Sequence, residues 1–221
     1  MQYQRGLKLR ILGARKLLRK FQLSLKRIFD IGASVLGLLF LIPVLALIAL
    51  SVCLDSPGSV FFELRAAGRD GRPFGQWKFR TMVRNARDTA HRFETSSMDP
   101  RITRVGRFLR RWSLDELPQL WNVLRGEMSV VGPRPTFIEI AAAYSPMQAR
   151  RLRMRPGLTG LAQLQGRNLL PWQQRIVLDN AYVDHYSLWL DFKILVRTIP
   201  VLLRGTGVYG ADGTVKMHDL A

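Results

Sequence analysis

The sequence is poor in cysteine, in histidine and in acids, and each shortage excludes a class of protein. One cysteine in 221 residues excludes a disulfide framework and a cysteine-based metal site. The three histidines, His91, His185 and His218, are far apart, which argues against a transition-metal site. Sixteen acids against 34 lysines and arginines leave a net charge of +18. This charge predicts an anionic partner: nucleic acid, an anionic membrane surface or a phosphorylated substrate.

Two catalytic loop motifs are also missing. The chain has no G-x-x-x-x-G-K-[ST] loop and no G-x-S-x-G turn, which excludes a P-loop enzyme and an α/β-hydrolase. RNA-binding signatures are absent too. Hydrophobic residues make up 48% of the chain and charged residues 23%, so the protein is not wholly disordered. Its length allows one substantial core, or a core and a membrane segment.

Residues 31–54 read "IGASVLGLLFLIPVLALIALSVCL" and contain no charged residue. A straight helix of this length reaches about 36 Å, and a hydrocarbon core is about 30 Å thick, so length permits a spanning helix. Lysines and arginines are abundant on both sides of the run, whereas a spanning helix has them mainly on its cytoplasmic side. Pro43 removes a helical hydrogen bond in mid-run. We therefore favour a re-entrant segment, broken at Pro43, over a plain spanning helix.

The flanking segments predict an interfacial helix and a small globular domain. Residues 1–25 have the pattern of a basic amphipathic helix on a membrane surface, although a nucleic-acid-binding arm has the same composition. Beyond the run we expect a strand, a glycine-rich turn and a second strand over 74–82. Helices are expected over 84–95, 99–112, 117–124, 145–153, 171–186 and 188–203, with a short strand and a rigid turn over 128–135. The fold class is therefore a mixed, helix-rich α/β domain against a bilayer.

"RRWSLDELPQLWN" places two acids, Asp115 and Glu116, directly after a run of arginines. Ser113-x-x-Glu116 matches a capping box, so one interpretation is a helix start. Pro118 weakens this interpretation, because proline is favoured at the first position of a helix. If the helix begins there, both acids lie on the preceding turn, where one can attack a substrate while the other binds a metal. Such carboxylates suit Mg2+, which shares its remaining ligands with phosphates and water.

Cationic side chains with ordered neighbours are the second candidate feature. Lys78 and Arg80 in "KFR" face the same side if this segment is a strand. Arg110 and Arg134 lie close to tryptophan or proline, and guanidinium groups bind phosphate oxygens bidentately. Each cation taken singly is better explained as a solvated surface charge, and their shared setting favours a phosphate site. "RPGLTGLAQLQGRN" adds a glycine-rich loop with Arg167, and such loops bring backbone N–H groups close to phosphates.

Several motifs together resemble one known family, the bacterial sugar transferases, which are monotopic polyprenyl-phosphate phosphoglycosyl transferases. The motifs are "KRIFD", the proline-broken run, "KFRTM", "DPRITRVGRFLRRWSLDELPQLWNVLRGEMSVVGPRP" and "RPGLTGLAQLQGRN", in family order and spacing. They extend over about residues 26–208. The resemblance implies a small, catalytic-core enzyme that transfers a sugar-1-phosphate from a UDP-sugar to undecaprenyl phosphate and releases UMP. That reaction initiates the synthesis of a bacterial surface glycan.

The resemblance also assigns residues. By analogy, Asp115 attacks the β-phosphorus of the donor and forms a phosphosugar-aspartyl intermediate. Glu116 is expected to orient the nucleophile, and both acids are expected to organise Mg2+. The family's helix break falls on Pro43. The implied substrate-binding cations are Lys78, Arg80, Arg110, Arg134 and Arg167.

The implied organisation has four parts: a basic extension over 1–25, a re-entrant membrane helix over 26–54, a catalytic domain over 55–208 and a tail over 209–221. The catalytic domain is expected on the cytosolic face of the bacterial inner membrane. Its expected partners are the UDP-sugar, undecaprenyl phosphate and the lipid bilayer, and not nucleic acid. The sequence leaves open the sugar, the glycan pathway and whether a homodimer forms.

Two other functions compete with the enzyme. A non-catalytic membrane scaffold would bind anionic lipid through its basic surface, and its acids would only cap a helix. A membrane-tethered nucleic-acid-binding protein would bind with a steep salt dependence, but base-reading motifs are absent. One departure from the family is that Ala66 replaces the arginine of its usual Arg-x-Gly, with Arg65 one residue earlier. The role of that arginine is therefore open.

Overall fold

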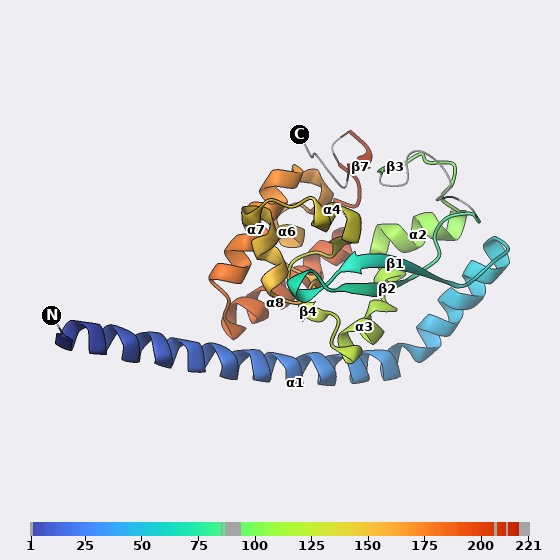
Figure 1. Cartoon of the computed structure of the whole chain (residues 1–221). Helices are drawn as coiled ribbons and strands as arrows, with labels where there is room; N and C mark the ends of the chain where they lie inside the picture. The colour runs from blue at the N-terminus through green and yellow to red at the C-terminus, as the bar shows by residue number, and fades with distance from the viewer. Residues whose placement is uncertain (1, 85, 87–93, 206, 211, 217–221) are drawn as a thin grey trace.

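The structure of the protein is a computed structural model that describes residues 2–84, 86, 94–205, 207–210 and 212–216. Its helices are α1 (Gln2–Asp55), α2 (Arg104–Trp112), α3 (Gln119–Arg125), α4 (Ile138–Ala142), α5 (Pro146–Ala149), α6 (Leu161–Leu164), α7 (Trp172–Asp184) and α8 (Leu188–Arg204). Its strands are β1 (Phe61–Ala67), β2 (Pro73–Phe79), β3 (Glu94–Ser96), β4 (Ser129–Val131), β5 (Thr136–Phe137), β6 (Gly157–Thr159) and β7 (Thr214–Lys216). Short 3-10 turns are η1 (Arg69–Gly71), η2 (Leu114–Glu116), η3 (Arg150–Arg153) and η4 (Arg167–Leu169). The mixed, helix-rich α/β class is confirmed, and Figure 1 shows the long α1 extending past the other elements.

The hairpin of β1 and β2 forms one sheet with β5, in the antiparallel order β2-β1-β5. The second strand was expected to continue to Met82, but β2 ends at Phe79. Beyond Phe79 the chain changes partner, because Thr81 O accepts a hydrogen bond from Thr103 N and Met82 pairs with Ile102. This change of partner brings the end of β2 against the start of α2.

α1 is docked on the other elements through buried polar side chains. Lys26 Nζ lies 2.7 Å from a carboxylate oxygen of Asp191 in α8, and both side chains are about nine-tenths buried or more. Asp30 accepts hydrogen bonds from Ser129 Oγ and from Val130 N of β4. Buried charges are tolerated only when they are paired. These contacts therefore set which face of α1 meets the domain.

The predicted break at Pro43 is not an interruption of the helix. α1 stays helical through Pro43, and Figure 1 shows it bending toward the other elements in its second half. Ile48 and Val52 of this half are buried against Phe79 of β2. Many other large apolar side chains of α1 are exposed. α1 has the length and the composition needed to cross a membrane, and its re-entrant path stays a prediction.

The helix expected over 84–95 is wrong where the structure describes that stretch. Residues 84 and 86 lie in a turn, and residues 94–96 form β3, which pairs antiparallel with β7. Residues 85 and 87–93 lie outside the described part of the chain. The other expected helices are confirmed as α2, α3, α5 with η3, α7 and α8. Gly126 ends α3 with a φ of 84°, which is the conformation that favours glycine at a helix end.

α8 carries an exposed apolar face and a buried one. Trp189, Phe192 and Val196 are more than half exposed. On the other side of the helix, Ile194 packs in a core cluster with Tyr182 of α7. An exposed apolar face of this kind fits a membrane surface or another apolar partner.

Candidate active site

The two acids lie on the turn η2, between α2 and α3. The turn follows Ser113, whose left-handed backbone conformation (φ 57°) ends α2. The predicted capping box is wrong, because the Ser113 side chain forms no capping hydrogen bond and Glu116 faces two cations. α3 begins at Gln119, directly after Pro118. Both acids therefore precede the helix, as the position of the proline predicts.

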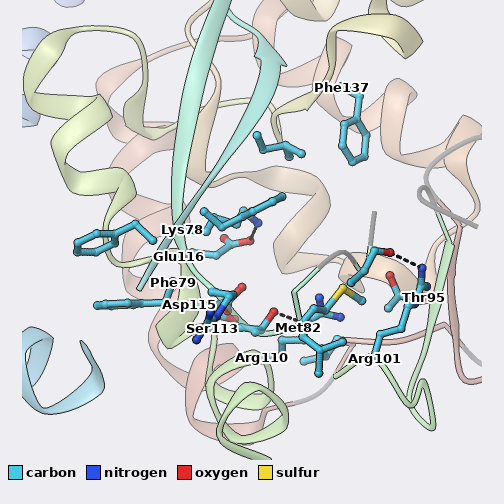
Figure 2. A pocket seen from close by; sticks show the side chains of 18 of the residues that line it. Lys78, Phe79, Met82, Thr95, Arg101, Arg110, Ser113, Asp115, Glu116 and Phe137 are labelled. Carbon is cyan, nitrogen blue, oxygen red and sulfur yellow. Dashed lines mark hydrogen bonds and ion pairs between the residues drawn. The ribbon is translucent and has the colours of Figure 1, made fainter. Parts of the chain in front are cut away.

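Glu116 is paired with two cations from distant parts of the chain. Its Oε1 accepts hydrogen bonds from Lys78 Nζ at 2.9 Å and from Arg134 Nη2 at 3.0 Å. Lys78 comes from β2, and Figure 2 shows it directed at Glu116. Burial alone would raise the pKa of Glu116, but Arg134 and Lys78 outweigh it and hold this pKa well below its usual range. Glu116 therefore stays ionised at neutral pH.

Asp115 is buried beside these charges without being bonded to them. Its exposed fraction is 9%, and none of the described residues donates a hydrogen bond to its carboxylate. Burial raises the pKa of Asp115, Lys78 opposes the rise, and Glu116 adds to it. A carboxylate in this state keeps its lone pairs available to an electrophile. The two neighbours thus differ, with Glu116 held in place and Asp115 available to react.

Arg110 reaches the turn because α2 packs closely on the chain after β2. Gly106 permits this approach, since a Cβ there would lie only 2.1 Å from Thr81 O. One helical turn later, Arg110 Nε donates to Thr81 Oγ1 at 2.9 Å. Its charge also opposes the rise in the pKa of Asp115. Arg110 therefore favours negative charge near Asp115 from a fixed position.

Arg167 contacts the turn of the acids from η4. Its Nη2 donates to Ser113 Oγ at 2.5 Å. Both residues have positive φ values, 56° for Arg167 and 57° for Ser113. Such backbone conformations cost on the order of 1–3 kcal/mol in residues other than glycine and persist where the surroundings impose them. The hydrogen bond therefore joins two residues with strained backbone conformations, Ser113 at the turn of the acids and Arg167 in η4.

Arg134 is held from behind by a buried ion pair. Arg151 of η3 donates to Arg134 O at 2.7 Å and lies 2.5 Å from Asp179 of α7. The side chains of Arg151 and Asp179 are 2% and 1% exposed. Burial raises the pKa of Asp179 to about 6, and Arg151 and the backbone N–H of Arg134 oppose the rise. The pair thus fixes the backbone of the residue whose side chain contacts Glu116.

The first part of the glycine-rich loop packs against the same segment, and a role of the loop in phosphate binding stays a prediction. Its strand β6 pairs in parallel with β4. A Cβ on Gly157 would lie 2.1 Å from Gly132 N, and Gly157 N donates to Pro133 O at 2.8 Å. Because this N–H is used inside the protein, the glycine serves close packing behind Arg134.

Arg80 caps α1 and does not approach the acids as Lys78 does. Its guanidinium donates to Pro57 O at 2.7 Å, to Ser56 O at 2.6 Å and to Val52 O at 3.2 Å. Val52 O lies in the last turn of α1, where the negative end of the helix dipole favours a cation. The expectation that Lys78 and Arg80 face one side of a strand fails, since β2 ends between them. A role of Arg80 in substrate binding stays a prediction.

The acids open into a pocket of about 760 Å³, a volume suited to a nucleotide-sized ligand. Figure 2 shows Thr95 and Phe137 on parts of the pocket away from Asp115 and Glu116. The predicted cations that line the pocket are Lys78, Arg80, Arg110, Arg134 and Arg167. One wall of the pocket therefore carries dense positive charge around two carboxylates.

The donor set fits a Mg2+ ion that shares its ligands with a substrate. Asp115 and Glu116 present carboxylate oxygens, and Mg2+ usually takes one or two protein carboxylates with phosphate oxygens and water. Within the described residues, no cluster of three or more histidine, cysteine, aspartate or glutamate side chains could hold a metal. An ion at the two acids would therefore need ligands from the substrate and water.

Comparison with known proteins decides the family. A family profile described as "Bacterial sugar transferase" matches residues 21–205. The chain belongs to this family. The matched range begins within α1, ends at the residue after α8, and includes every predicted site residue.

Three relatives illustrate the similarity of this sugar transferase to known proteins. It is 45% identical over 196 residues to "Undecaprenyl-phosphate glucose phosphotransferase" of Komagataeibacter xylinus. The matched region covers 84% of this chain and 37% of that protein. It is 44% identical over 194 residues to "UDP-glucose:undecaprenyl-phosphate glucose-1-phosphate transferase" of Caulobacter vibrioides, and this match covers 83% of this chain and 72% of that protein. It is 40% identical over 198 residues to "Exopolysaccharide production protein ExoY" of Rhizobium meliloti, with coverage of 83% and 88%. The chain thus spans little more than a third of the Komagataeibacter relative.

Ala66 stands at the position where the resemblance implies an arginine. Ala66 is fully buried and pairs with Phe74 of β2 and Phe137 of β5. An arginine at this buried position would need a partner for its charge. Arg65 is exposed and lines the pocket, so a positive charge is present nearby from the preceding position.

Sequence reasoning missed the residues that support the site from behind. Arg151 lies in "ARRLRMR", where nothing separates a buried arginine from exposed neighbours. Asp179 is one acid within an ordinary amphipathic pattern, and Thr81 carries no motif of its own. The signal that existed was indirect, since the prolines on both sides of Arg134 indicate an ordered backbone.

Proposed function

We propose that this sugar transferase moves a sugar-1-phosphate from a UDP-sugar to undecaprenyl phosphate and releases UMP. The observation that carries the proposal is a buried Asp115, to which none of the described residues donates a hydrogen bond, beside an ionised Glu116 in a cation-lined pocket. Two relatives named for undecaprenyl phosphate support the acceptor, and one named for UDP-glucose supports the donor class. The product would be a polyprenyl-diphosphate-sugar, the first intermediate of a bacterial surface glycan.

The first half-reaction uses Asp115 as the nucleophile. One of its carboxylate oxygens bonds to the β-phosphorus of the UDP-sugar, and the bond from this phosphorus to the bridging oxygen breaks. The electron pair leaves with UMP, and the sugar phosphate stays on Asp115 as an acyl phosphate. Negative charge grows on the phosphate oxygens during this step, and fixed cations stabilise it best. Lys78, Arg110 and Arg134 are placed for this task by contacts that exist before a substrate binds.

The second half-reaction returns the enzyme to its starting state. A phosphate oxygen of undecaprenyl phosphate bonds to the same phosphorus, and the bond between this phosphorus and Asp115 breaks. The carboxylate is regenerated. Covalent catalysis lets the two anionic substrates react in turn, so they need not share the pocket at the moment of bond formation.

We propose that Asp115 and Glu116 also hold Mg2+. Bound there, the ion would offset the charge of the donor diphosphate. Glu116 is oriented without it, because Lys78 and Arg134 already hold one of its oxygens. Among the described residues no side chain or backbone group donates a hydrogen bond to the Asp115 carboxylate, so its oxygens can serve the substrate.

We propose that α1 is a re-entrant anchor and that the site lies at the cytosolic face of the bacterial inner membrane. The exposed apolar side chains of α1 and of α8 support this placement, since such surface is stabilised by an apolar phase. The charged head of undecaprenyl phosphate lies at the level of the lipid headgroups. A site at that level could receive it while a UDP-sugar arrives from the cytosol.

The test of the proposal measures UMP from the full chain in lipid particles with Mg2+. A panel of UDP-sugars would be tried with and without undecaprenyl phosphate. We expect continuous UMP release only when acceptor and the preferred donor are both present, and at most one equivalent of UMP per enzyme without acceptor. Folded protein that releases no UMP from any donor would overturn the proposal and favour the non-catalytic membrane scaffold.

Removal of divalent cations is expected to stop turnover. Excess EDTA should lower the rate of UMP release by about 100-fold or more, because the donor charge is no longer offset. Added Mg2+ should restore the rate, and EDTA saturated with Mg2+ beforehand is the control. Equal rates with and without EDTA would refute the metal role while leaving the transfer reaction in place.

A further inference from the structure

The chain beyond the family match lines the same pocket. The match ends at residue 205, and the predicted tail outside the catalytic domain begins at residue 209. Val208 and Tyr209 nevertheless line the pocket that contains the two acids. We call residues 207–210 the C-terminal wall.

The C-terminal wall is bonded to the loop that carries Arg167. Asn168 donates from its backbone N to Gly207 O at 3.1 Å and from Nδ2 to Val208 O at 2.7 Å. Gly207 has a φ of 72°, and a Cβ there would lie 2.8 Å from a backbone oxygen and 3.2 Å from the Arg167 side chain. A side chain at this position would therefore push the wall away from Arg167.

The segment that contains Gly207 also has a glycine spacing known from dinucleotide-binding proteins. "GTGVYG", residues 205–210, has the spacing of the dinucleotide-binding turn G-x-G-x-x-G. That motif needs a strand before it and a helix after it. Here α8 precedes it and a turn follows, so the context of a dinucleotide fold is absent.

The other end of the segment is attached to β3. β7 pairs with β3, and Ser97 N donates to Gly213 O at 2.9 Å. Thr95 of β3 lines the pocket as well, and Figure 1 shows β7 beside β3. At the end of the wall, Gly210 N donates to Thr214 O of β7 at 2.6 Å, so the wall is bonded both to the Arg167 loop and to the strand that pairs with β3.

We infer that the C-terminal wall is part of the donor-binding site and that Tyr209 contacts the non-reacting part of the nucleotide-sugar. This inference rests on the proposed function. A tyrosine ring can stack on a nucleobase or on the apolar face of a sugar, and its hydroxyl can donate and accept hydrogen bonds. Asp115 and the cations act on the diphosphate. A residue on the wall beside Arg167 therefore affects donor binding and donor choice more than the chemical step.

Substitution of Tyr209 tests the contact directly. Tyr209→Ala should raise the KM for the UDP-sugar about tenfold and change kcat less than about threefold, because the lost contact is one of binding. Tyr209→Phe separates the hydroxyl from the ring. Leu169→Ala is the control, since Leu169 belongs to η4, is half exposed and does not line the pocket. Leu169→Ala should leave both constants unchanged.

Inhibition by UMP locates the contact, because UMP carries the nucleobase and no sugar. If Tyr209→Ala weakens UMP inhibition, the ring contacts the nucleoside. If UMP inhibition is unchanged while the preference between UDP-glucose and UDP-galactose shifts, the ring contacts the sugar. Either result supports the C-terminal wall as part of the donor site.

A matched pair of glycine substitutions tests the position of the wall. Gly207→Ala should raise the donor KM, because its Cβ meets the Arg167 loop. Gly71 has a similar φ of 75° with no neighbouring atom within 4 Å of the added Cβ. Gly71→Ala therefore carries the same backbone cost without the collision and should leave the donor KM unchanged.

Different results would overturn the inference about the C-terminal wall and the proposed function. Active wild-type protein in which Tyr209→Ala and Gly207→Ala alter neither the donor KM nor UMP inhibition would overturn the inference and leave the proposed function standing. Folded wild-type protein that releases no UMP would overturn the proposed function itself. Thermal unfolding of each variant, compared with wild type, checks that a change in KM does not arise from loss of fold.

Discussion

Asp115→Asn is expected to abolish sugar-phosphate transfer and to leave the protein folded. An amide is a poor nucleophile, and loss of the nucleophile should lower the rate of UMP release by about 1,000-fold or more. The substitution breaks no hydrogen bond from the described residues and removes a buried charge, so the stability should not fall. UMP release and thermal unfolding, measured on one preparation, check both parts.

Covalent labelling separates the nucleophile from a merely important residue. Wild-type protein incubated with a donor radiolabelled in the sugar, without acceptor, should retain label, and Asp115→Asn should not. Asp70→Asn is the matched control, because Asp70 is an exposed acid in the turn between β1 and β2 and should label like wild type. Label retained by Asp115→Asn would assign the attack to another residue.

Arg151→Met is expected to destabilise the fold by about 3–5 kcal/mol, the usual cost of leaving one charge of a buried pair without its partner. Asp179, 1% exposed, would lose the guanidinium that lies 2.5 Å away. Arg134 O would lose its donor as well. Thermal or denaturant unfolding in detergent measures the loss of stability. The kcat of the folded fraction should also fall, because Arg134 is no longer held against Glu116.

The neighbouring arginine provides a matched control. Arg150 pairs with Asp184 on the surface, and their side chains are 39% and 37% exposed, so Arg150→Met should cost less than about 1 kcal/mol. The double variant Arg151→Met/Asp179→Leu should recover much of the stability, since apolar residues can replace a buried pair. It should not recover the activity if the pair positions Arg134. A single Arg151→Met variant as stable as wild type would contradict this account.

Predictions from short sequence motifs were correct where the local structure depends on only a few neighbouring residues. Pro118 correctly placed the acids before α3, because its effect acts within one helical turn. The capping box of Ser113 failed for a tertiary reason, since Arg167 binds the Ser113 hydroxyl from 54 residues away. The helix expected over 84–95 failed at residues 94 and 95 for the same reason, because β3 pairs with a strand near the C-terminus.

The sequence by itself determined the chemistry available to this protein: an adjacent acid pair, a set of cations, an apolar helix and membership of the sugar transferase family. Only the tertiary structure decided which contacts, and therefore which role, each of these residues has. Lys78 and Arg134 come to Glu116 from 38 and 18 residues away and bond to it, not to Asp115. Arg80 bonds to carbonyl groups at the end of α1. Burial and long-range pairing set the pKa and the freedom of a side chain. Neither is contained in the few residues around it, so two neighbouring carboxylates of the same chemistry acquire different properties only when the chain has folded.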